Sequence, residues 1–168
     1  LEQVGVHCRV FNRFVPVVSL RQNNRDHRKY MIVDGRMAFT GGINMADEYI
    51  NVKRRFGHWK DSAIRLEGDA VWSMTVSFLA MWDFTHSEEE HFTPFRPEPA
   101  QGGAQGYVQP YHDCPWDNEA VGQSVYLNLI YRAKRYVYIT TPYLVIDYSL
   151  TMACLLYTSP SPRDRTRS

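Results

Sequence analysis

Three polar side chains near the start of the chain have the types and the spacing that phosphate chemistry requires. His27 and Lys29 stand two residues apart in a run of strand-forming residues. Asn44 follows closely after the pair Gly41-Gly42. Since alternate residues of a strand face the same side, His27 and Lys29 would project together, with about 6–7 Å of chain between them. Lysine supplies a point charge, asparagine a neutral donor, and histidine a nucleophile or proton donor, so the sequence predicts a phosphate site.

Asp34 stands five residues after Lys29 and has the opposite strand parity to His27. Its side chain is therefore expected to point away from the phosphate site. The dipeptide Asp34-Gly35 is a strong signal for a two-residue hairpin turn. We expect Asp34 to hold this turn through its side chain rather than to touch phosphate.

The elements that must position these residues follow an α/β pattern. Strands are expected over residues 4–11, 27–33, 36–40 and 62–66, and a short helix over 43–50. From Gly68 the apolar residues recur at helical spacing, which predicts a helix with Asp69 as its N-cap and an end near Asp83. A second unit is expected to have β-α-β order, with a short strand at Tyr107, a helix over 119–135 and a strand over 136–141.

Composition divides the chain into four expected segments. These are an α/β segment over residues 1–84, an acidic linker rich in Pro and Gly over 85–106, a second α/β segment over 107–153, and a tail over 154–168. The tail changes abruptly to Pro, Ser and Arg without periodicity, and it resembles the translation of a sequencing adapter. A genuine basic, disordered tail is the alternative. In both cases we expect no packed structure from Cys154 onward.

The length of the chain and the distribution of its charged residues limit the classes of function that it can have. The chain has 168 residues, of which 44% are apolar, enough to bury a core. Residues 1–65 carry twelve basic and six acidic side chains, whereas residues 66–131 carry one basic and ten acidic side chains. The basic first part suits a phosphate-bearing substrate, and the acidic middle argues against a continuous nucleic-acid surface.

Several sequence features of other protein classes do not occur in the given chain. No stretch reaches the roughly 18–20 apolar residues of a membrane span, and no signal peptide leads the chain. Cys8, Cys114 and Cys154 lie far apart without CxxC spacing, which argues against a disulfide framework and a zinc site and favours a reducing compartment. No cluster of carboxylates, Cys or His has the spacing of metal ligands.

The complete spacing HxKxxxxD, followed by GGxN, is the signature of the phospholipase D superfamily. Three stretches also resemble bacterial cardiolipin synthases: DHRKYMIVDGRMAFTGGINMADEYI, FGHWKDSAIRLEGDAV and GYVQPYHDCPWDNEAVGQSVYLNLIYRAKRYVYITTPYLVID. The resemblance covers nearly all of residues 1–153. It implies a phospholipase D-like α/β fold, a mixed sheet flanked by helices, with two similar tandem domains that share one site. This chain departs from the family because it contains only the first HxKxxxxD motif.

The resemblance also implies an activity: phosphatidyl transfer between two phosphatidylglycerol molecules, giving cardiolipin and glycerol, with no metal and no cofactor. By resemblance His27 is the nucleophile that forms a phosphohistidyl lipid, and Asp34 completes its catalytic motif. Lys29 and Asn44 would neutralise the phosphoryl oxygens. Asp61 would orient His27, with a plain turn aspartate as the alternative. The implied partner is anionic membrane lipid, and the implied location is the bacterial cytoplasmic membrane.

Several alternatives stay open. A phospholipase D-type phosphodiesterase or nuclease would use the same residues on another substrate, although no nucleic-acid partner is expected. A monomer with one motif is expected to be inactive, whereas a homodimer would bring together two copies of His27. Lys53-Arg54-Arg55 is interpreted as a solvated run, with attraction to anionic headgroups as the alternative. The other histidines are interpreted as structural or surface residues: His7, His58, His86, His91 and His112.

Overall fold

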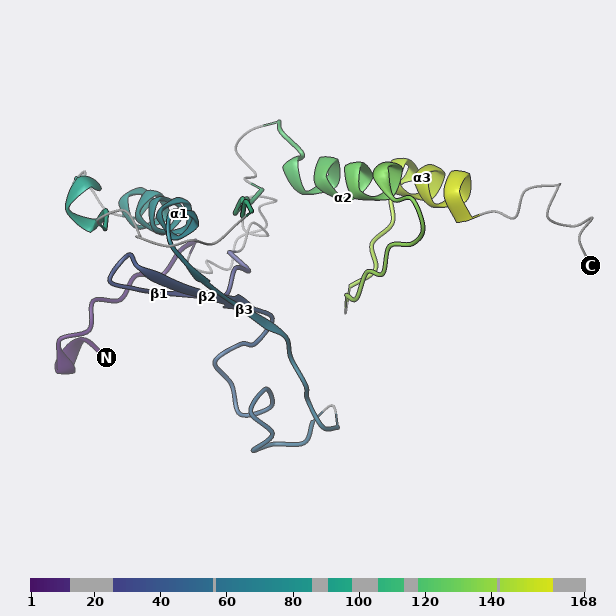
Figure 1. The fold of residues 1–168 in the computed structure, drawn as a ribbon. Helices are drawn as coiled ribbons and strands as arrows, with labels where there is room; N and C mark the ends of the chain where they lie inside the picture. Colours follow the sequence, from purple (N-terminus) through teal and green to yellow (C-terminus); the bar gives the residue numbers. More distant parts are fainter. Residues whose placement is uncertain are drawn as a thin grey trace, which may run out of the picture. The chain divides into compact units, whose positions relative to one another are not determined.

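The computed structural model describes residues 1–12, 26–55, 57–85, 91–97, 106–113, 118–141 and 143–158. The chain divides into two compact units, Leu1–Pro110 and Tyr111–Ser168 (Figure 1). Within the described ranges, no helix has both the length and the apolar character that a bilayer span demands. The four segment boundaries expected from composition stay predictions.

A three-stranded antiparallel sheet forms the centre of the first unit, in the order β1-β2-β3. Its strands are β1 (Tyr30–Val33), β2 (Met37–Gly41) and β3 (Ala63–Glu67). Thr40 of β2 lies opposite Tyr30 on one side and Ile64 on the other. The described part of the sheet is antiparallel throughout, whereas a mixed sheet was expected.

The turn between β1 and β2 differs from the two-residue turn expected at Asp34-Gly35. Val33 lies opposite Met37, so three residues, Asp34 to Arg36, make the connection. The Arg36 amide donates to the Val33 carbonyl over 3.0 Å. Asp34 and Gly35 both have positive φ, 52° and 65°, which Asp tolerates and Gly adopts freely. The dipeptide therefore marks the turn correctly, but the strand register lengthens it by one residue.

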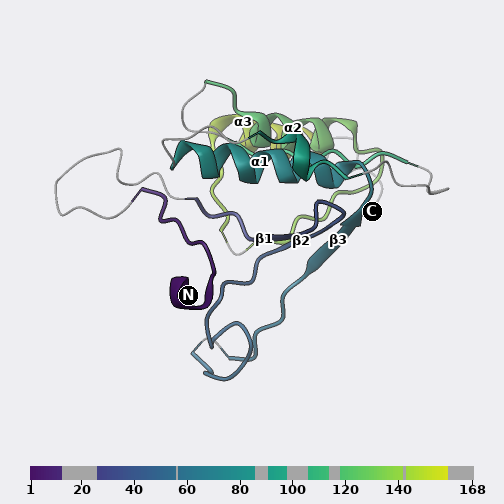
Figure 2. The same cartoon turned by 90° about the vertical axis from the view of Figure 1, so that its left-hand side faces the viewer.

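Helix α1 (Ala70–Phe84) covers one face of this sheet (Figure 2). Val71 and Met74 of the helix and Ala38 of β2 form the buried core. The partly buried hydrophobic side chains against this core are Tyr30, Ile32 and Leu66. The helix has the bounds that its apolar spacing predicts, although Asp69 precedes it without a capping hydrogen bond from its side chain.

Three expected elements of the first unit are wrong or shorter. Residues 4–11 form no strand: the 3-10 turn η1 (Glu2–Val4) is followed by irregular chain. Residues 43–50 form bends and turns instead of a helix, because so short a helix is unstable alone and its Asn and Asp residues favour turns. β1 begins at Tyr30 instead of at residue 27, because its pairing with β2 starts there. A 3-10 turn, η3 (Thr93–Phe95), follows α1.

The second unit contains helices α2 (Val121–Arg132) and α3 (Tyr148–Thr158), which contact one another. The strands expected at Tyr107 and over 136–141 are wrong, because the described residues offer those segments no partner strand. α3 continues through Cys154 to Thr158, so the expectation of an unstructured tail is wrong for 154–158. Residues 159–168 lie outside the described residues. Both units together are α/β in class, as predicted.

Candidate functional site

Lys29 lies directly before β1, at the end of the sheet where β2 finishes. Its backbone carbonyl accepts hydrogen bonds from the Thr40 hydroxyl at 3.1 Å and the Gly41 amide at 3.3 Å. These two bonds tie the predicted lysine to the first residue of the glycine pair. The local sequence achieves this because the hairpin places the end of β2 opposite the start of β1.

The lysine ammonium folds back toward the predicted histidine. Lys29 Nζ donates to the His27 carbonyl over 2.6 Å, and His27 itself is exposed. Burial lowers the pKa of Lys29, and the nearby Asp26 carboxylate partly opposes this shift. Arg28, between them, instead reaches α1, where its guanidinium donates to the Ser77 hydroxyl over 2.5 Å. His27 and Lys29 are thus neighbours, with Arg28 anchoring the segment to the helix.

Asp61 holds the glycine pair from the other side. Its Oδ1 accepts hydrogen bonds from the backbone amides of Gly42 and Ser62, each over 2.9 Å. Its Oδ2 accepts a hydrogen bond from the Trp59 indole over 3.0 Å. These bonds, with the Trp59 bond the largest cause, lower the pKa of the Asp61 carboxyl, and burial opposes them. The Asp61 carboxylate therefore holds the backbone at Gly41-Gly42, called the glycine turn below. Its expected action on His27 stays a prediction.

Both glycines lie where a Cβ atom would crowd a neighbouring group: the Asp61 carboxylate at Gly42 and backbone at Gly41. A Cβ on Gly42 would lie 3.0 Å from each carboxylate oxygen of Asp61. A Cβ on Gly41 would lie 2.8 Å from the Ser62 carbonyl, which belongs to backbone and cannot move aside easily. Only glycine lets β2 end so close to the residue that begins β3. The crowding at these two positions explains why the pattern GGxN begins with two glycines.

The connection between β2 and β3, residues 42–62, is closed by Trp59. The Asn51 amide side chain accepts from the Trp59 amide over 2.6 Å and donates to the Trp59 carbonyl over 2.9 Å. The Tyr49 ring meets the Trp59 ring edge to face, with centroids 4.7 Å apart. Asn44 lies half-buried near the start of this loop, and its carbonyl accepts from the Ala46 amide over 2.9 Å. Sequence reasoning missed the pairing of Asn51 with Trp59, because it depends on a contact across eight residues of a loop without regular structure.

Asp34 lies at the opposite end of β1 from Lys29, about 16 Å away at ~3.3 Å per residue. Its turn packs against residues 94–97, and a Cβ on Gly35 would lie only 2.5 Å from the Phe95 carbonyl. Asp34 and Arg36 line a cleft of about 720 Å³ there, together with Phe95. The structure therefore joins Lys29 to the glycine pair and to the His27 backbone, but it leaves Asp34 apart from them.

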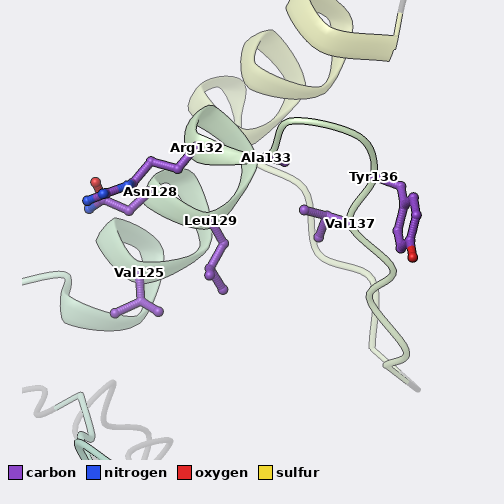
Figure 3. A pocket seen from close by; sticks show the side chains of 7 residues that line it. All are labelled: Val125, Asn128, Leu129, Arg132, Ala133, Tyr136 and Val137. Carbon is purple, nitrogen blue, oxygen red and sulfur yellow. The ribbon is translucent and has the colours of Figure 1, made fainter. Parts of the chain in front are cut away.

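A second hollow lies in the second unit, between α2 and the segment that follows it (Figure 3). Its volume is about 460 Å³, and the side chains of Leu129 and Val137 point into it. None of the predicted site residues lines this hollow. Among the residues that the structure describes, no group of three or more His, Cys, Asp or Glu side chains is placed to hold a metal ion.

Comparisons with known proteins show that the chain is similar to part of longer bacterial proteins. No family model and no solved structure matches the chain. It is 47% identical over 154 residues to an uncharacterized protein of Streptococcus mutans, covering 91% of this chain and 33% of that protein. The chain spans about a third of the length of the curated relatives that it matches. It is therefore homologous to one segment of longer bacterial proteins.

Relatives whose names state an activity identify the family. The chain is 34% identical over 151 residues to cardiolipin synthase 2 of Staphylococcus epidermidis, covering 86% of this chain and 30% of that protein. It is 34% identical over 139 residues to a cardiolipin synthase of Staphylococcus aureus, covering 79% of this chain and 27% of that protein. The resemblance to bacterial cardiolipin synthases that the motifs predicted is confirmed.

Proposed function

We propose that this chain supplies one half of the active site of a cardiolipin synthase. The reaction is phosphatidyl transfer between two phosphatidylglycerol molecules, which yields cardiolipin and glycerol. One observation carries the proposal: Lys29, Gly41, Gly42 and Asp61 are linked by hydrogen bonds at one end of the sheet, in a chain whose homologues are named cardiolipin synthases. The phospholipase D-like fold with two tandem domains and the location at a bacterial membrane belong to the same proposal.

His27 is the proposed nucleophile. Its imidazole forms a bond to the phosphorus of the first phosphatidylglycerol while the bond from phosphorus to the glycerol oxygen breaks. The departing oxygen takes a proton from a second histidine, which the chain's single HxKxxxxD motif does not supply. That histidine then removes the proton from a hydroxyl of the second phosphatidylglycerol. This hydroxyl oxygen attacks phosphorus, and the bond to His27 breaks.

Lys29 and Asn44 stabilise the negative charge that develops on the phosphoryl oxygens. Lys29 brings an ammonium group beside the backbone of His27. Asn44 stands two residues after Gly42, at the start of the loop that Asp61 binds through the Gly42 amide. Asp61 acts by fixing that loop through the Gly42 amide, which is the role that its hydrogen bonds support. An action of Asp61 directly on His27 remains the alternative.

A chimeric enzyme tests this function. In the chimera, this chain replaces the matching segment of the Staphylococcus aureus cardiolipin synthase, so that a second half-site is present. We expect the chimera to convert labelled phosphatidylglycerol into cardiolipin and glycerol in detergent micelles. A chimera that folds, as judged by a cooperative thermal transition, but hydrolyses phosphodiesters without forming cardiolipin would favour the phosphodiesterase alternative instead.

A further inference from the structure

The loop over residues 42–62 extends away from α1 and from the strands that it connects, in both views of the ribbon (Figures 1 and 2). Four large apolar side chains of this loop are exposed to water: Ile43 at 42% and, more strongly, Met45 at 108%, Val52 at 68% and Ile50 at 61%. Exposed apolar side chains gathered in one segment are typical of a surface that docks on a partner or a membrane. The loop therefore has an apolar surface that the described part of the fold leaves uncovered.

This loop is held in its conformation at several points. Asn51 and Trp59 exchange two hydrogen bonds, and the Tyr49 ring packs on Trp59. Asp61 ties the end of the loop to its first residue, Gly42. A preorganised loop presents its apolar side chains without a large ordering cost on binding.

Basic side chains accompany the apolar ones. Lys53, Arg54 and Lys60 are all exposed. The loop also contains the acidic Asp47, which pairs with Lys53 over 3.1 Å, and Glu48. Arg54 and Lys60 are therefore the basic side chains on which attraction to a negative surface depends. An exposed apolar segment flanked by Lys and Arg matches the chemistry of an anionic bilayer surface, where acyl chains lie beneath negative headgroups.

We propose that the 42–62 loop docks on the surface of an anionic lipid bilayer. Met45, Ile50 and Val52 enter the headgroup boundary, and Arg54 and Lys60 lie against the negative headgroups. This inference rests on the proposed function in one respect: docking brings Asn44, within the same loop, to the level of the phosphate groups of a lipid substrate.

Co-sedimentation of the 168-residue chain with vesicles tests the docking. Vesicles of mixed phosphatidylglycerol and phosphatidylcholine are expected to bind the chain, and binding is expected to weaken with salt. Met45→Ser/Ile50→Ser/Val52→Ser is expected to weaken binding by at least about tenfold. Arg54→Gln/Lys60→Gln is expected to cost about fivefold for each residue at low salt.

The matched control is Leu144→Ser/Val145→Ser/Ile146→Ser, which removes three exposed apolar side chains from the second unit. Its binding should equal that of the unaltered chain. Equal binding by the loop variant, an equal loss in the control, or no vesicle binding by the unaltered chain would each overturn the proposal. So would tighter binding to duplex DNA that the serine substitutions do not affect. Thermal unfolding of each variant shows that the fold is kept.

The two proposals fail separately. Vesicles with phosphatidylserine in place of phosphatidylglycerol should bind equally well, because the loop is proposed to recognise a surface and not the substrate. Vesicle binding by a chimera that does not form cardiolipin would reject the proposed function alone. Transfer in micelles by a chimera whose loop variant keeps full activity on vesicles would reject the docking alone.

Discussion

The two ends of the β1–β2 hairpin contain the two halves of one sequence motif and differ in chemistry. At one end, the Lys29 carbonyl, the glycine pair and the Asp61 carboxylate form a chain of hydrogen bonds. At the other end, Asp34 and Gly35 adopt positive φ and pack against Phe95. The difference teaches that HxKxxxxD need not describe one cluster of side chains, because a strand separates its lysine from its aspartate.

The largest expected effect belongs to His27. In the chimera, His27→Ala should abolish phosphatidyl transfer, because no group remains to form the bond to phosphorus. Since His27 is exposed, the thermal unfolding midpoint should stay nearly unchanged. The rate of cardiolipin formation and the unfolding curve provide the measurement. Substantial residual transfer would show that His27 is not the covalent residue.

The next effect concerns the oligomeric state of the chain alone. A monomer should not synthesise cardiolipin, because losing the general acid that protonates the leaving glycerol oxygen costs about 10²–10⁴-fold. A homodimer that brings together two copies of His27 should recover transfer. Labelled phosphatidylglycerol, given to size-separated fractions of known mass, distinguishes the two cases. Turnover by a verified monomer would contradict the need for two histidines.

Lys29→Ala in the chimera should reduce the transfer rate by about 10²–10³-fold, the usual cost of losing one charge contact to a transition state. Lys134→Ala, which removes an exposed lysine of the second unit, is the matched control and should leave the rate unchanged. The measurement is the rate at saturating phosphatidylglycerol. A loss equal to that of the control would remove Lys29 from the site.

Asp34 tests the opposite end of the hairpin. Asp34→Ala should destabilise the fold by about 1–2 kcal/mol, because alanine resists the positive φ of 52° at this position. Asp34→Gly should keep most of the stability, since glycine adopts positive φ readily. Chemical denaturation of both variants measures the difference. An Asp34→Ala chain with normal stability, whose chimera has no activity, would place Asp34 in the chemistry after all.

The same contrast shows what the sequence could predict. The hairpin and α1 were predictable because Asp34-Gly35 and the spacing of Val71 and Met74 are local signals. The contact of Asp61 with Gly42 was not, because the two residues are nineteen positions apart and meet only when β2 and β3 pair. The strand expected over 136–141 was wrong for a related reason: alternation describes a face, but a strand also needs a partner.

The smallest expected effect is the pH dependence that Asp61 contributes. Its hydrogen bonds lower the pKa of the folded carboxyl below the ordinary value of 3.8. A carboxyl with a lowered pKa in the fold stabilises it fully above its unfolded pKa, and this contribution is lost as pH falls through the folded pKa.

Asp61→Asn should therefore flatten the acid limb of the unfolding midpoint between about pH 5 and pH 2, and the Gly42 amide resonance should lose its titration. Asp69→Asn is the matched control, because the Asp69 side chain makes no capping hydrogen bond. If Asp69→Asn flattened the acid limb and Asp61→Asn did not, the carboxylate would not be what holds the glycine turn. Strand pairing alone would then fix the Lys29 end of the hairpin, whereas positive φ angles and packing against Phe95 fix the Asp34 end.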